Sequence, residues 1–248
     1  MKNNLNAVDP ICEEIYKYEY GTKQFSLNRK RVFKENNLFE RYNEFIYYTE
    51  YQLKDEIVQI TDELLDNIKL EILNRNVLEY NGDLKKQFSV AGILYDKKNK
   101  DYIILKSKSE RLNGKLTMVQ GHAAIECCDD FNVEQAVNDV INDETDNFNI
   151  VMNNIIKELE EEICLEKEFI KHITPVYLVS PKDSRVSREH MGVVSVIEID
   201  GAEVKSGEPE KNTVVRMTKE ELVKEENMEL MDSWLYLTIK KLQEEDLL

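Results

Sequence analysis

Two apolar runs separated by a short polar break constrain the fold of this chain most. The first run, QFSVAGILYD, covers residues 87–96, the second, DYIILKSKS, covers residues 101–109, and the four residues KKNK lie between them. Short apolar runs joined by a polar turn are typical of a β-hairpin. The next segment, GKLTMVQGHA at residues 114–123, predicts a third strand and a turn at Gly121. These segments place a β-sheet in the middle of the chain.

One helix is expected to follow these strands. From about Ile150 to Glu162, apolar residues recur at the spacing of one helix face. The inner face of this helix is expected to consist of Val151, Ile155, Ile156, Leu159 and Ile163. The helix should therefore pack against the sheet and leave its other side to polar residues.

More strands and helices complete the chain. The segments HITPVYLVSP, residues 172–181, and GVVSVIEID, residues 192–200, are expected to be strands. The stretch from residue 217 to residue 245 is expected to be helical, with Thr218 and Glu221 as a capping box. Strands interleaved with helices in this order predict a mixed α/β layer structure.

The N-terminal third has a different texture, rich in aromatic and helix-forming residues. Apolar residues recur near a period of 3.6, which predicts an amphipathic helix that ends near residues 74–76. These residues are Ile57, Ile60, Leu64, Leu65, Ile68, Ile72 and Leu73. We therefore expect a mostly helical N-terminal extension at residues 1–84. A second domain should follow at residues 85–248, with a polar insertion at about residues 123–148 that contains a short helix near residues 133–141.

A group of aromatic residues lies in the N-terminal third. It consists of Tyr42, Phe45, Tyr47, Tyr48 and Tyr51. Such a group could stack on bases, but an aromatic cluster beside a helix is more often part of a core or an interface. We expect core or interface positions for these side chains.

The charge balance excludes several classes of function. The chain has 248 residues with 33 Lys and Arg against 49 Asp and Glu, a formal net charge of −16. Binding to a nucleic-acid backbone relies on Lys and Arg, and anionic membranes repel an acidic surface. We therefore expect neither nucleic acid nor a membrane as a partner. A small anionic substrate could still bind if metal ions bridge it to carboxylates.

Cysteine usage and hydropathy point to a cytoplasmic protein. No stretch approaches the roughly 20 apolar residues of a membrane span, and the N-terminus shows no apolar signal core. The four cysteines have no CxxC spacing and only three histidines beside them, which suggests neither a zinc site nor a disulfide framework. They are Cys12, Cys127, Cys128 and Cys164, and the adjacent pair has no evident catalytic partner.

The segment KELEEEICL, residues 157–165, concentrates negative charge in the expected helix. Glu158, Glu161 and Glu162 stand at i, i+3 and i+4, so all three project from one side. Like charges at this spacing repel one another unless a cation lies among them. The spacing alone leaves two interpretations open, a metal-binding face and the solvated surface of an acidic helix.

With its flanking segments, this helix resembles the Nudix box, G-x5-E-x7-R-E-U-x-E-E-x-G-U, where U is apolar. Gly121 falls on the box glycine, Lys157 on the box arginine, and the three glutamates on box glutamates. The segments KQFSVAGIL, SERLNGKLTMVQGHA, SREHMGVVSVIEI and MDSWLYL resemble, in order and spacing, a branch of predicted Nudix phosphoesterases. That branch carries an insertion after its GGH-like turn, which accounts for the long segment between Gly121 and Lys157. The resemblance covers about residues 85–242.

The resemblance implies a Nudix-type α/β/α sandwich with a mixed sheet. It also implies a pyrophosphohydrolase that uses Mg²⁺ or Mn²⁺ to cleave a phosphoanhydride bond in a nucleoside-diphosphate-linked or similar small substrate. Glu158, Glu161 and Glu162 are the implied catalytic and metal-binding residues. Glu158 would be a ligand or the base that takes a proton from the attacking water. The backbone carbonyl of Gln120 is a further implied ligand.

Five residues are implied substrate contacts: Arg111, Gly121, His122, Lys157 and Arg188. Arg111 and Arg188 could bind phosphate or pair with neighbouring glutamates. His122 could touch a phosphate or make a structural hydrogen bond. Lys157 replaces an arginine that orients the glycine loop, and it keeps the charge without the planar fork.

Departures from the box support a rival interpretation, a catalytically impaired Nudix-fold binding or regulatory module. Asn149 stands where the first box glutamate belongs, and Cys164 stands on the late glycine. Glu126, Asp129 or Asp130 could replace the missing carboxylate, but such residues are more commonly solvated side chains of a loop. A third interpretation, an acidic helical interaction protein, predicts neither a metal site nor a closed mixed sheet.

Three further expectations concern single residues and assembly. His190 should fix a loop, and Trp234 should anchor the core. A homodimer could form through the N-terminal extension.

Overall fold

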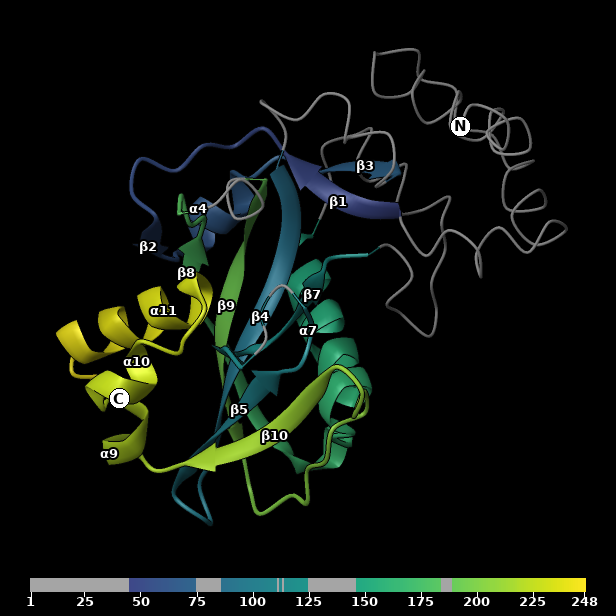
Figure 1. The fold of residues 1–248 in the computed structure, drawn as a ribbon. Helices are drawn as coiled ribbons and strands as arrows, with labels where there is room; N and C mark the ends of the chain where they lie inside the picture. Colours follow the sequence, from purple (N-terminus) through teal and green to yellow (C-terminus); the bar gives the residue numbers. More distant parts are fainter. Residues whose placement is uncertain (1–44, 75–85, 111, 113, 125–145, 184–188) are drawn as a thin grey trace, which may run out of the picture.

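The computed structural model describes residues 45–74, 86–110, 112, 114–124, 146–183 and 189–248 (Figure 1). The strands are β1 (Phe45–Thr49), β2 (Ile57–Gln59), β3 (Glu71–Asn74), β4 (Lys86–Asp96), β5 (Asp101–Ser107), β6 (Leu116–Thr117), β7 (Val119–His122), β8 (Ile170–Val179), β9 (His190–Ile199) and β10 (Asn212–Met217). The helices are α4 (Asp62–Asp66), α7 (Asn147–Ile163), the 3-10 turn η1 (Lys167–Phe169), α9 (Lys219–Leu222), α10 (Glu225–Met228) and α11 (Ser233–Glu244). None of the helices in these ranges has the length and the apolar content that a membrane span requires.

The described strands form one mixed sheet of ten strands. Its main path runs β10-β5-β4-β9-β8-β2, while β1 and β7 pair with β4, β3 with β1, and β6 with β5. The pair β4 and β9 is parallel over its whole length, and the other pairs are antiparallel. The predicted hairpin at residues 87–109 is confirmed as β4 and β5. The strands predicted at residues 172–181 and 192–200 are confirmed as β8 and β9.

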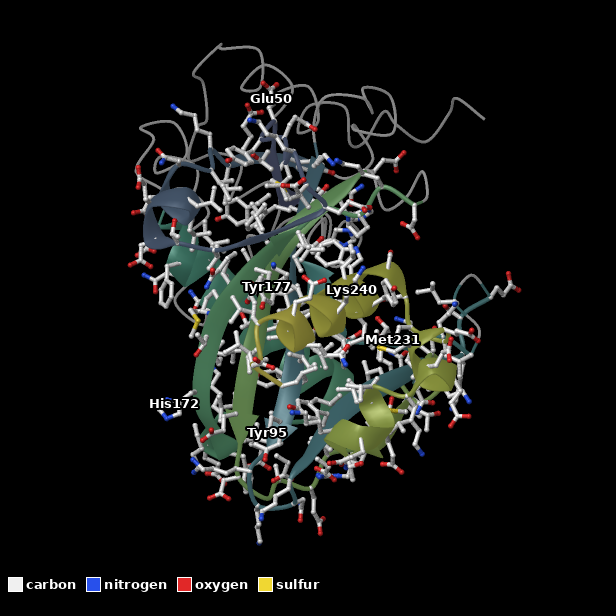
Figure 2. The ribbon with its side chains drawn as sticks, turned by 90° about the vertical axis from the view of Figure 1, so that its left-hand side faces the viewer. Glu50, Tyr95, His172, Tyr177, Met231 and Lys240 are labelled. Carbon is white, nitrogen blue, oxygen red and sulfur yellow. The ribbon has the colours of Figure 1, made fainter. Side chains whose placement is uncertain are left out.

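Helices cover both faces of this sheet, which confirms the α/β/α sandwich. Strand residues alternate between two cores because successive side chains point to opposite faces. On β4, Phe88 and Val90 belong to the core that contains the inner face of α7, whereas Ala91 and Ile93 belong to the core under α11. Figure 1 shows α7 and α11 on opposite sides of β4 and β9. Figure 2 looks onto the face that α11 crosses, with Lys240 in front of the sheet.

The C-terminal predictions are confirmed. Thr218 accepts a hydrogen bond from the Glu221 backbone, and the Glu221 carboxylate accepts one from the Thr218 N–H, which completes the capping box of α9. Trp234 is 9% exposed and packs in the core under α11. The buried side of α11 therefore closes the second layer of helices over the sheet.

The long helix predicted from Ile57 is wrong. Residues 57–59 form β2, which pairs with β8, and α4 ends before β3 begins at Glu71. The apolar residues of this stretch serve two cores: Ile57 packs against the core under α11, and Leu65 and Ile68 belong to the core under α7. Their helical spacing therefore does not describe one helix face.

The sheet also includes strands that precede the expected domain boundary at residue 85. β1 pairs with both β3 and β4, so residues 45–74 share the sheet with the rest of the chain. Tyr47 and Tyr48 are 6% and 1% exposed, which confirms core positions for these two aromatic residues. The predicted helical extension at residues 1–44 and 75–84, and the short helix at residues 133–141, lie outside the described residues.

Candidate active site

The helix α7 carries the carboxylates, and three sets of contacts fix its position. Asp146 caps its N-terminus by accepting a hydrogen bond from the Asn149 N–H at 2.9 Å. Its buried inner face includes Val151, Ile155, Leu159 and Ile163. The amide of buried Asn154 accepts a hydrogen bond of 2.8 Å from the N–H of Ala124, just after β7. The helix is thus held against the strand that carries Gln120 and Gly121.

Glu162 and Glu158 lie directly against β7. The N–H of Gln120 donates a hydrogen bond of 3.0 Å to Oε2 of Glu162. In an antiparallel ladder, the N–H and C=O of one residue point to the same side of the strand, so the Gln120 carbonyl also faces away from β4 toward α7. A Cβ added at Gly121 would lie 2.0 Å from Oε1 of Glu158. Only glycine therefore leaves room for that carboxylate.

The structure corrects the expected turn at Gly121. Gly121 lies inside β7 and pairs with Val90 of β4. The residue is required for the close approach of Glu158 rather than for a turn conformation. The predicted third strand itself is confirmed as β6 and β7.

A segment between β9 and β10 closes the C-terminal end of α7. The N–H groups of Lys205 and Gly207 donate to the carbonyls of Ile163 and Glu162, at 3.2 and 2.9 Å. A Cβ added at Gly207 would lie 1.8 Å from the carbonyl oxygen of Glu161. Only glycine at position 207 therefore lets the segment pass this close to the helix. This docking brings Glu208 to the carboxylates of α7.

Sequence reasoning missed Gly207 and Glu208. The only local signal is a glycine and a proline on either side of Glu208, in a chain with 8 Gly and 4 Pro. Such a pattern predicts a turn but not what the turn packs against. The contact with α7 is a property of the tertiary structure.

Electrostatics set Glu158 apart from an ordinary surface glutamate. Burial and the nearby carboxylate of Glu161 raise its pKa, Lys157 lowers it, and Glu208 raises it again, with a net result of about 7. One repulsive neighbour comes from the same helix, and the other comes from the docked segment. The site therefore holds more negative charge than its lysines offset.

Glu162 is perturbed in the same direction. Burial raises its pKa to about 8, with contributions from the carboxylates of Glu158 and Glu208, although the Gln120 hydrogen bond and Lys211 act against this shift. Glu162 and Glu158 are thus two adjacent, partly buried carboxylates that favour a proton or a cation in their vicinity.

Glu161 has a different environment. Its side chain is 57% exposed, and its Oε1 lies 3.7 Å from Nζ of Lys157, one turn earlier in α7. The glutamate triplet is therefore not equivalent: two members face β7, and the third pairs with a lysine at the surface.

The donor set fits a hard divalent cation. In the described part of the chain, no three His, Cys, Asp and Glu side chains already stand as a metal-ligand group. Mg²⁺ commonly takes only one or two carboxylates and completes its shell with water and substrate oxygens. Glu158, Glu162 and the Gln120 carbonyl supply oxygen ligands of this kind, and their excess negative charge is what a cation would offset.

His122 lies on the other side of the sheet from these carboxylates. In β7, Val119 and Gly121 face α7, so the alternation of the strand directs His122 to the opposite face. There its Nε2 lies 3.1 Å from Nε2 of His190, the first residue of β9. The two rings are tilted by 42° with centroids 5.3 Å apart, so the nitrogens meet nearly end to end. One nitrogen donates to the other, and β7 is tied to the start of β9.

Two of the departures from the box have clear structural counterparts. Asn149 lies in the first turn of α7, where its amide donates to Asp146, and at 1.5 Å per residue it is about 14 Å or more from Glu158. Cys164 ends the helix in the left-handed conformation, with φ 51° and ψ 37°. This conformation favours glycine, which explains why a glycine is expected at that position.

Several candidate residues lie outside the described part of the chain. They are Arg111, Arg188, Cys12, Cys127, Cys128, Glu126, Asp129 and Asp130. Their implied roles stay predictions.

Comparison with known proteins bears on the fold. No family model and no curated protein matches the sequence. Among solved structures, Tm1382, a candidate Nudix hydrolase, matches with a TM-score of 0.59 and 16% identity, over 81% of this chain and 99% of that chain. A bifunctional NMN adenylyltransferase/ADP-ribose pyrophosphatase from Francisella tularensis matches with a TM-score of 0.41 and 17% identity, over 64% of this chain and 42% of that chain. A MutT Nudix hydrolase from Burkholderia pseudomallei matches with a TM-score of 0.39 and 13% identity, over 62% of this chain and 96% of that chain.

The likeness to Tm1382 extends over almost the whole length of that protein. It agrees with the two helical layers, the mixed sheet and the glutamate-bearing helix packed on it. The described part of this chain has the Nudix fold.

Proposed function

We propose that this protein is a divalent-metal-dependent hydrolase that cleaves a phosphoanhydride bond in a nucleoside-diphosphate-linked or similar small substrate. One observation carries the proposal: Glu158 and Glu162 are held side by side against β7, one by the space at Gly121 and the other by the Gln120 N–H. Placing two ionised carboxylates together in a partly buried site is costly unless a proton or a cation is bound there. A small phosphorylated substrate, rather than nucleic acid, fits a chain with a net charge of −16.

The chain's residues divide the work of such a reaction. Glu162 and the Gln120 carbonyl would hold the cation. Glu161 would become a further ligand by exchanging its ion pair with Lys157 for a contact with the cation. Glu158 would either complete the ligand set or accept a proton from the attacking water, since its pKa of about 7 suits a base at neutral pH. When bound, Mg²⁺ or Mn²⁺ supplies charge neutralisation at the phosphate oxygens and activates water. Cleavage would release one phosphate ester from each side of the broken anhydride.

A binding or regulatory module without turnover is the second candidate. The Lys157 and Glu161 pair favours it, because an exposed carboxylate already paired with a lysine is not preorganised as a ligand. Cys164 favours it as well, since a strained helix end next to Glu162 would hold that carboxylate less firmly.

One screen separates the two candidates. Hydrolysis products are separated by chromatography and measured for a panel of nucleotides, nucleotide sugars and dinucleotides with Mg²⁺ or Mn²⁺, using the wild type, Glu161→Gln and Glu162→Gln. Glu160→Gln is the matched control, because Glu160 is on the same helix but its side chain is exposed. Its Oε1 lies 4.0 Å from Nζ of Lys167. The hydrolase proposal predicts turnover that Glu162→Gln abolishes and Glu160→Gln retains. Absence of turnover across the panel, or equal turnover in all variants, contradicts it.

A further inference from the structure

We propose that Lys211 is a tethered counter-ion of the active site, which pairs with Glu208 when the metal is absent and with the phosphate groups of the substrate when the metal is bound. This inference rests on the proposed function and assigns a role to a residue outside the resemblance to the Nudix box. It is drawn from the docking of residues 205–211 onto α7.

The position of this segment is fixed by backbone contacts. The N–H of Gly207 bonds to the Glu162 carbonyl at 2.9 Å, and the N–H of Lys205 bonds to the Ile163 carbonyl at 3.2 Å. No side chain fits between Gly207 and the Glu161 carbonyl. The next residue, Glu208, is therefore held at the end of α7 that carries the site glutamates.

The charges around Lys211 make it part of this cluster. Its Nζ lies 2.5 Å from Oε1 of Glu208. The Glu208 carboxylate in turn raises the pKa of both Glu158 and Glu162. The hydrogen bond with Glu208 is the main cause of the raised pKa of Lys211, and the carboxylates of Glu210 and Glu162 also contribute. Lys211 thus offsets part of the negative charge that a metal ion would otherwise offset.

The pairing with Glu208 is easily exchanged. The Lys211 side chain is 59% exposed, and the Glu208 side chain is 34% exposed. An exposed ion pair of this kind contributes little to stability, because water and salt screen the attraction. A divalent cation among the carboxylates repels the ammonium group and competes for the same oxygens, while a bound phosphoanhydride attracts it. Lys211 can therefore change partners without unfolding any part of the site.

Opposite effects on two ligands follow from this exchange. Removing the ammonium group should tighten the binding of the cation, because a competitor is lost. The same change should weaken the binding of an anionic diphosphate to the metal-loaded protein, because a partner is lost. Lys205→Gln is the matched control: it changes the net charge equally, its side chain is exposed, and its backbone contact is retained.

The test measures two affinities in wild type, Lys211→Gln and Lys205→Gln. Mn²⁺ binding is followed by the electron paramagnetic resonance signal of free Mn²⁺, and imidodiphosphate binding at saturating Mn²⁺ is followed by calorimetry. Lys211→Gln should tighten Mn²⁺ binding about three- to tenfold and weaken imidodiphosphate binding by a similar factor at low salt. Both effects should shrink as salt is added, and Lys205→Gln should change either affinity by less than about twofold.

The outcomes separate this inference from the proposed function. Equal effects of Lys211→Gln and Lys205→Gln overturn the role of Lys211 even when the wild type binds Mn²⁺ and turns over substrate. Opposite shifts specific to Lys211→Gln support the role of Lys211 even when no substrate is hydrolysed, which would contradict the hydrolase proposal alone. Absence of Mn²⁺ binding to the wild type overturns both.

Discussion

The backbone N–H of Gln120 and the carboxylate of Glu162 are joined by a hydrogen bond of 3.0 Å. This bond connects the strand that follows the central hairpin to the last turn of the only long helix on that face of the described structure. Because Gly121 is the next residue of the strand, the contact also fixes the space that the Glu158 carboxylate fills. The two carboxylates therefore lie side by side only when β7 and α7 keep this position relative to each other.

The first prediction concerns pH in the absence of metal. Burial raises the pKa of Glu162 to about 8 and that of Glu158 to about 7, so the folded state holds these protons more tightly than the unfolded chain does. The resulting stabilisation is complete below the unfolded-state pKa of about 4.3 and is lost as the pH rises toward 8. We expect the free energy of unfolding of the metal-free protein to fall by a few kcal/mol between about pH 5 and pH 8.

Urea denaturation across this pH range checks that expectation. Glu162→Gln should give a flatter pH dependence than the wild type, because an amide does not titrate. Glu160→Gln should reproduce the wild-type dependence, because Glu160 is exposed. The same slope in all three proteins would show that Glu162 is not perturbed as described.

The second prediction concerns the space at Gly121. Gly121→Ala should displace the Glu158 carboxylate, since the added Cβ would lie 2.0 Å from Oε1. Mn²⁺ affinity should fall by about tenfold or more, in line with the loss of a supporting contact in a metal site. Adding Glu158→Asp, which shortens the side chain, should recover part of the loss in the double variant. Strictly additive effects of the two substitutions would contradict a direct clash.

The third prediction concerns the end of α7. Cys164 adopts φ 51°, where a side chain is strained. Cys164→Gly should raise the free energy of unfolding by about 0.5–1 kcal/mol, the net of relieved strain and greater freedom of the unfolded chain. Cys164→Ala is the control, because it removes the thiol and keeps the Cβ. If alanine stabilises the protein as much as glycine does, the backbone conformation is not the cause.

The fourth prediction concerns the ion pair between Asp96 and Arg216 at the C-terminal end of β4. Asp96 is fully buried, and Arg216 donates to it at 2.9 Å and to Asp101 at 2.9 Å. Burial alone would raise the pKa of Asp96, but hydrogen bonds from Arg216, Gly201 and Asn99 lower it to about 2.

Arg216→Met leaves this carboxylate buried without its cation, which should cost about 3–5 kcal/mol in the free energy of unfolding. Asp101→Asn should cost less than about 1 kcal/mol, since it retains the Asp96 pair. In the wild type, the stabilisation from Asp96 is complete above about pH 4 and is lost as the pH falls through about 2. Urea denaturation measures the free energy of unfolding of both variants and its pH dependence in the wild type. A decrease in this free energy of less than about 1 kcal/mol for Arg216→Met would contradict the account.

Much of the fold could be predicted from local patterns. The strands β4 and β5 were predictable as short continuous apolar runs because both faces of each strand are buried, one in each core. The helix α7 was predictable because its apolar residues form one face against a single core. The segment from Ile57 differs from α7, since its apolar residues are spread over β2, α4 and β3 and are divided between two cores. A helical period appears there by coincidence, and pairing with β8 decides the structure.

The candidate site divides in the same way. Glu158 and Glu162 were predictable from spacing within one helix and from the resemblance of the flanking segments. The position of His122 was not, because strand alternation in β7 carries it to the face opposite Glu158. Glu208 was also not predictable, because its place depends on Gly207 docking against a distant helix carbonyl.

The most direct test of the account is the rate at which a phosphoanhydride substrate is hydrolysed, followed by chromatography of its products, as Mn²⁺ is titrated into metal-free wild type and Glu162→Gln. The account predicts a saturable rise in rate for the wild type and no rise for Glu162→Gln at any Mn²⁺ concentration that leaves the protein folded. A wild-type rate that does not depend on Mn²⁺, or a Glu162→Gln variant that responds to Mn²⁺ as the wild type does, would contradict a metal-dependent site built on the contact between Glu162 and Gln120.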